Sequence, residues 1–271
     1  MSHSYTKEDL KEIFFSSLEM FNDCIDSDIS ADNTIIDFFT PKNGAAVYER
    51  FCTKRFPKYL DEPYRDKGYF DDIAAQAFVG KGCYGVLIRE NVDFTLGEVM
   101  QMFLHEISHL YCTQNEIPGG NFFDKYCMGS GVEDGMINAG YAIWRETIAD
   151  IMADTVISEN ATITLALAHD EIQQLNRKIT ISNPSSKKAM SLLIAYIMIS
   201  AEVAGTTSWT VAEKKIKRII GFTDPLMYGI LKLVFEQLHI SPFWTITPDF
   251  IIELGQMYLS LLSMKAFRVG Q

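Results

Sequence analysis

The sequence has no concentration of positive charge. Its largest basic cluster is residues 214–218, and the formal net charge of the 271 residues is −11. A surface that binds nucleic acid needs clustered Lys and Arg side chains to neutralise phosphates, so this composition excludes nucleic acid as an expected partner. The basic cluster itself is typical of the exposed face of an amphipathic helix.

Cysteines are few and show no paired spacing. The five are Cys24, Cys52, Cys83, Cys112 and Cys127. The first nine residues are polar and lack the apolar core of a secretory signal peptide. Together these features predict unbridged thiols and a cytoplasmic, reducing location.

Long apolar runs are absent as well. The longest, residues 189–204, includes Glu202 and is shorter than the roughly 20 residues that span a bilayer. We therefore expect no membrane partner and interpret this run as a buried helix. The apolar content of 48% is that of a soluble globular protein, and the length permits one large domain or two lobes.

A helix is predicted with unusual clarity near the middle of the chain. Thr95 and Glu98 have the spacing of a capping box, in which the two residues satisfy each other's backbone N–H groups. Phe94 and Val99 flank that box as a hydrophobic staple does. The helix should begin near Leu96 and end around Thr113, before a polar and glycine-rich stretch.

Residues 105–109 of this helix read His-Glu-Ile-Ser-His, an HExxH motif. His105 and His109 are four residues apart, so both imidazoles leave the same helix face and can share one metal ion. Glu106 is rotated to the side of that face. From there its carboxylate can reach a metal-bound water without itself being a ligand.

A catalytic zinc site needs a third protein ligand and an open position. The other histidines are scattered, at His3, His169 and His239. No histidine occurs in the six residues after His109, so the extended three-histidine pattern of metzincins is absent.

A second helical run, which continues through Val156, offers carboxylates instead. Glu146 and Asp150 are four residues apart and share a face, and the small residues Ala149 and Ala153 would let this helix approach the first closely. The flanking residues Ile148, Ile151 and Met152 are apolar rather than lysines, which favours a ligand role over a solvated acidic face.

An HExxH helix followed by a helix with an E-x-x-A-D pattern resembles the gluzincin family of zinc metallopeptidases, over roughly residues 80–156. The resemblance implies that His105, His109 and Glu146 bind one Zn²⁺ per chain. It also implies that Glu106 is the general base and that Asp150 accepts a hydrogen bond that orients one histidine ring.

The fold implied is α+β and mainly α-helical, a zincin-like two-lobed fold with a small sheet. Residues 1–158 would form the zincin-like lobe, with an edge strand, the HExxH helix and the third-ligand helix. Residues 159–271 would form an all-helical C-terminal lobe packed against it in a single compact unit. Beyond the two motif helices, we expect helices near 7–23, 161–178, 208–220, 225–238 and 248–266, and one that starts at Asn183-Pro184.

Two segments near the motif allow more than one interpretation. Residues 82–89 predict a strand, either an edge strand along which a peptide substrate pairs or an ordinary internal strand. Residues 118–140 hold six glycines and predict a long flexible connection, either a substrate-contacting lid or a passive linker.

The favoured function is zinc-dependent hydrolysis of peptide bonds in a peptide or protein substrate. Glu106 would take a proton from the metal-activated water and pass it to the leaving amine. A further donor should stabilise the tetrahedral oxyanion. Its candidates are Tyr126, Tyr141, Tyr228 and His239.

Two alternatives stay open. The chain can be a catalytically inactive zinc-containing regulatory or binding protein, with the site closed by a fourth ligand such as Cys112, Asp154 or a loop carboxylate. It can also be a helical interaction protein whose HExxH motif is accidental. The metal content and the number of open coordination positions distinguish the three.

Overall fold

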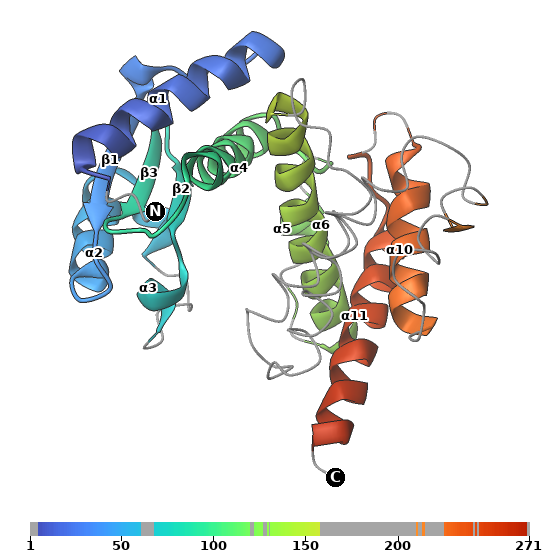
Figure 1. Ribbon diagram of the computed structural model, residues 1–271. Coiled ribbons are helices and arrows are strands. Elements are labelled where there is room, and N and C mark those ends of the chain that lie inside the picture. The colour runs from blue at the N-terminus through green and yellow to red at the C-terminus, as the bar shows by residue number, and fades with distance from the viewer. Residues whose placement is uncertain are drawn as a thin grey trace. The chain divides into compact units, whose positions relative to one another are not determined.

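A computed structural model (Figure 1) describes residues 5–60, 68–119, 122–126, 129, 131–157, 210, 213–214, 225–240, 242 and 244–269. The fold is mainly helical with one small mixed sheet, as the α+β prediction requires. The chain divides into two compact units. One holds the residues up to Asn115 together with Ala149–Asn160, and the other holds Glu116–Ile148 together with Ala161–Gln271.

The first unit is built around a three-stranded sheet. Its helices are α1 (Lys7–Cys24), α2 (Gly44–Arg55), α3 (Tyr69–Asp72) and α4 (Leu96–Gln114), and its strands are β1 (Thr34–Phe39), β2 (Ala75–Val79) and β3 (Tyr84–Arg89). The strand order is β1-β3-β2, with β1 parallel and β2 antiparallel to β3. The predicted helix near residues 7–23 is therefore confirmed as α1.

The expectation of an edge strand before the HExxH helix is wrong. Strand β3 occupies the centre of the sheet, so the internal-strand alternative holds. The reason is local: β2 precedes β3 by a short turn that contains Gly82 at φ +73°, and it pairs back along β3. The edge strand next to α4 is β2, which packs against that helix (Figure 1).

The core of this unit follows from the alternation along β3. Leu87 is fully buried in an aromatic cluster that α2 contributes to. Gly85 faces the same cluster, and a Cβ there would stand 2.8 Å from Phe51 Cζ and would also overlap the ring of Phe56. A glycine is needed because the phenyl rings fill the space that a side chain would take.

Helix α4 begins as predicted. Thr95 is its N-cap, and the reciprocal hydrogen bonds with Glu98 form the capping box. The helix ends at Gln114, one residue later than expected, because the backbone N–H and the side chain of Asn115 both donate to the Tyr111 carbonyl. Its apolar residues Val99, Phe103, Leu104, Ile107 and Leu110 are fully buried.

The second unit is helical in its described part. It contains α5 (Phe122–Tyr126), α10 (Pro225–Leu238), α11 (Pro248–Val269) and most of the long helix α6 (Val132–Ile157). The helices predicted near 225–238 and 248–266 are confirmed, each beginning at its proline. None of the helices in the described ranges is long and apolar enough to cross a membrane.

Several expectations fall on parts of the chain outside the described residues. These are the lobe boundary at 158/159, the helix near 161–178, the helix that starts at Asn183-Pro184 and most of the helix near 208–220. They stay predictions, as does the packing of two zincin-like lobes.

The connection predicted over residues 118–140 is shorter than expected, because α6 already begins at Val132 and α5 occupies part of the remainder. One of the glycines that suggested a loop, Gly140, has a packing role instead. A Cβ on Gly140 would overlap the backbone carbonyl of Ile251 in α11, and one on Gly255 would overlap the carbonyl of Met136. The backbones of α6 and α11 therefore touch at a glycine pair.

This contact predicts opposite effects for two substitutions in α6. Gly140→Ala should lower the free energy of unfolding by about 1–3 kcal/mol, because the methyl group meets backbone atoms that cannot rotate away. Gly135→Ala is the matched control: nothing lies within 4 Å of its Cβ position, so the better helix propensity should stabilise by up to about 1 kcal/mol. Urea unfolding followed by circular dichroism measures both. Equal effects would contradict the close contact.

Candidate metal centre

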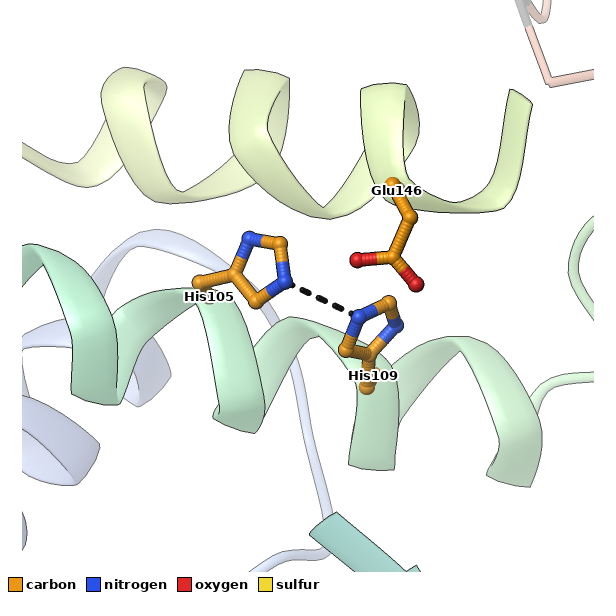
Figure 2. A group of neighbouring side chains, drawn as sticks. All are labelled: His105, His109 and Glu146. Atoms are coloured by element: carbon orange, nitrogen blue, oxygen red, sulfur yellow. Dashed lines mark hydrogen bonds between the residues drawn. The ribbon is translucent and has the colours of Figure 1, made fainter. Parts of the chain in front are cut away.

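Helix α4 brings the two motif histidines together. Their side chains are half-buried, the ring centroids are 4.6 Å apart and the two Nε2 atoms are 3.0 Å apart. Because the rings come from consecutive turns, their Nε2 atoms point at a common position beside the helix (Figure 2). The fully buried Ile107 and Leu110 hold the rest of α4 in the core and so fix this face.

Helix α6 supplies the third group. One ligand atom from each of His105, His109 and Glu146 lies within 4.8 Å of the other two. Figure 2 shows the Glu146 carboxylate directed toward the two imidazole rings. Within the described ranges, no other group of three histidine, cysteine or acidic side chains gathers in this way.

Asp150 lies one helical turn after Glu146 and contacts the Nδ1 side of the His105 ring. Its Oδ1 atom is 2.6 Å from His105 Nδ1. When Asp150 is ionised, the shared proton belongs to Nδ1, and the Nε2 lone pair of His105 then points toward His109 and the ligand group. An imidazole in this tautomer is oriented for binding a metal through Nε2.

Glu106 lies on α4 next to the first histidine and is half-buried. It is not a member of the group that gathers around the common position. Two imidazoles and one carboxylate are a donor set that zinc takes in catalytic sites, with the fourth position open. The residues present therefore fit a zinc ion.

The fourth ligands that the binding-protein alternative requires do not join the group in the described part of the chain. Cys112 is buried, with its Sγ atom 3.6 Å from Met152 Sδ. Asp154 accepts a hydrogen bond of 2.7 Å from the Gln101 side chain. The described cysteines are all thiols rather than disulfides.

The structure gives contacts for three of the four candidates for the oxyanion donor. Tyr126 and Tyr141 both pack against the ring of Phe122. His239 Nδ1 is 2.8 Å from the carbonyl oxygen of Phe235. The side chain of Tyr228 is outside the described residues. The donor stays one of four candidates.

The contact between Gln101 and Asp154 is the part of this region that sequence reasoning missed. Burial raises the pKa of the Asp154 carboxyl, the Gln101 hydrogen bond lowers it, and the charges of Asp150 and His105 act in opposite directions. A signal was present in the sequence: Gln101 is four residues before His105, and Asp154 is four residues after Asp150.

Comparison of the chain with known protein families, with curated proteins and with solved structures finds no match. The gluzincin resemblance therefore rests on the motif residues and their geometry alone.

The hydrogen bond between His105 and Asp150 predicts that Asp150→Asn weakens zinc retention. Loss of such an outer partner typically costs about 10–100-fold in metal affinity, because the histidine loses its fixed tautomer and part of its basicity. Competition with a chromogenic chelator measures the affinity, and circular dichroism should show unchanged helix content. Asp23→Asn, at an exposed position of α1, is the control. Equal retention in both variants would remove Asp150 from the site.

Proposed function

We propose that this protein is a zinc-dependent hydrolase of peptide bonds, similar to gluzincin metallopeptidases. The observation that carries the proposal is the ligand group itself. The side chains of His105, His109 and Glu146 converge from two helices that are far apart in sequence. An accidental HExxH sequence would not bring a third ligand to the same place.

The protein's own residues have separable roles in this proposal. A bound zinc ion would polarise the scissile carbonyl and acidify a water molecule. Glu106 accepts the proton of that water and delivers it to the leaving amine, which requires a carboxylate near the metal but outside its ligand set. Asp150 keeps His105 in the tautomer that presents Nε2.

The substrate in this proposal is an extended peptide or a segment of a protein. Strand β2 supports this because it is a sheet edge and packs directly against α4, which carries the motif. An edge strand holds a peptide through backbone hydrogen bonds, which are tolerant of sequence. The zincin-like two-lobed architecture and a cytoplasmic location, in keeping with the unbridged thiols, belong to the same proposal.

Zinc binding is the first test. The purified protein should contain about one zinc per chain after mild dialysis, since three preformed ligands bind tightly. His105→Ala and His109→Ala should each lose most of it, as measured by elemental analysis. Full zinc content in both variants would refute the ligand assignment, and a wild-type protein without zinc that also takes up none would refute the proposed function.

The second test concerns Glu106. Glu106→Gln should keep zinc and the fold while peptidase activity falls by about 10²-fold or more, because general base catalysis is lost and the ligands are untouched. A library of fluorogenic peptides provides the activity readout, and Glu133→Gln, an exposed residue in the first turn of α6, is the control. Loss of zinc with activity would instead make Glu106 a ligand. Zinc binding without cleavage of any peptide would favour the regulatory or binding protein.

A further inference from the structure

Three pairs of side chains connect α4 and α6 at regular intervals. Gln101 contacts Asp154, His105 contacts Asp150, and His109 shares the ligand group with Glu146. Along α4 the three members are spaced by four residues in increasing order. Along α6 they are spaced by four in decreasing order. The contacts thus form an antiparallel ladder of three rungs, one per helical turn.

The rungs of His105 with Asp150 and of His109 with Glu146 contain the residues assigned above to the metal centre. The rung of Gln101 with Asp154, called the third rung below, has no assigned role. Gln101 Nε2 donates a 2.7 Å hydrogen bond to Asp154 Oδ1, and both side chains are half-buried. Burial of the carboxyl is the main influence on its pKa, which is raised. The carboxyl of Asp154 is therefore partly shielded from water, next to the pair of His105 and Asp150. The amide of Gln101 donates a hydrogen bond to it.

Register decides whether the ligand group exists. A slip of one helix by a single residue moves its side chains by about 1.5 Å along the axis, whereas metal–ligand distances tolerate only about 0.2 Å. The hydrophobic attraction between apolar side chains is itself non-directional. A hydrogen bond between an amide and a carboxylate is directional, so the third rung opposes it.

We propose that Gln101 and Asp154 are positioning residues of the metal centre, which hold α4 and α6 in the register that gathers the ligand atoms of His105, His109 and Glu146. This inference rests on the metal centre of the proposed function. The pair contributes no ligand and touches no substrate. It acts through the His105 and Asp150 rung next to it.

The experiment exchanges the two chemical groups of the rung. The double variant Gln101→Glu with Asp154→Asn places the carboxylate on α4 and the amide on α6, with the same side-chain lengths and the same net charge as the wild type. Gln101→Leu also keeps the charge but removes the donor. Gln114→Leu removes a glutamine from the same helix outside the ladder and is the matched control.

Three measurements are made on each protein: the zinc dissociation constant by chelator competition, the visible spectrum of the Co²⁺-loaded protein, and thermal unfolding of the metal-free protein. Gln101→Leu should bind zinc about tenfold more weakly and show an altered Co²⁺ spectrum. The exchanged variant should recover wild-type affinity to within about threefold, together with the wild-type spectrum, because the hydrogen bond is restored in the reverse direction. Gln114→Leu should match the wild type.

The outcomes separate the inference from the proposed function. If the wild type binds no zinc, the proposed function fails. If the wild type binds zinc and Gln101→Leu changes only the thermal unfolding, the rung is merely structural and the inference is overturned. Failure of the exchanged variant to recover zinc binding would also overturn it. If Gln101→Leu does not fold, the exchanged variant decides alone: a folded protein with about tenfold weaker binding contradicts the inference.

Discussion

The arrangement of this protein's candidate site depends on one requirement: polar side chains at the contact of two largely apolar helices must find partners there. An imidazole or carboxylate that is buried without a hydrogen-bond partner destabilises the fold. The hydrogen bond between His105 Nδ1 and Asp150 meets this requirement at the centre of the contact. Because it engages Nδ1, it leaves the Nε2 atom of His105 on the side of His109.

Local signals in the sequence predicted where three of the helices begin. The capping residues Thr95 and Glu98 placed the start of α4, and prolines placed the starts of α10 and α11, because caps act within one helical turn. Spacing by four residues also predicted which side chains share a helix face. Spacing alone did not give the order in which successive turns of α4 and α6 pair, and for that reason the contact between Gln101 and Asp154 was missed.

Strand order and the extent of α6 were the less predictable parts. The sequence of β3 is equally compatible with a central or an edge position, since a strand in either position buries apolar side chains. Its central position results from pairing with β1 on one side and β2 on the other. Glycines near Val132 resemble a loop in sequence. The role of Gly140 depends instead on a tertiary contact, because its lack of a side chain is explained by the backbone of α11.

That glycine contact has a mechanical consequence. An α-helix transmits displacement along its axis with little internal deformation, because each turn is tied to the next by backbone hydrogen bonds. Gly140 and Glu146 lie less than two turns apart on α6, roughly 9 Å along the axis. A substitution in α11 that alters its contact with Gly140 is therefore expected to tilt or shift α6, the helix that carries Glu146. The position of the Glu146 carboxylate is thus sensitive to substitutions in α11, a helix that contributes no residue to the group of His105, His109 and Glu146.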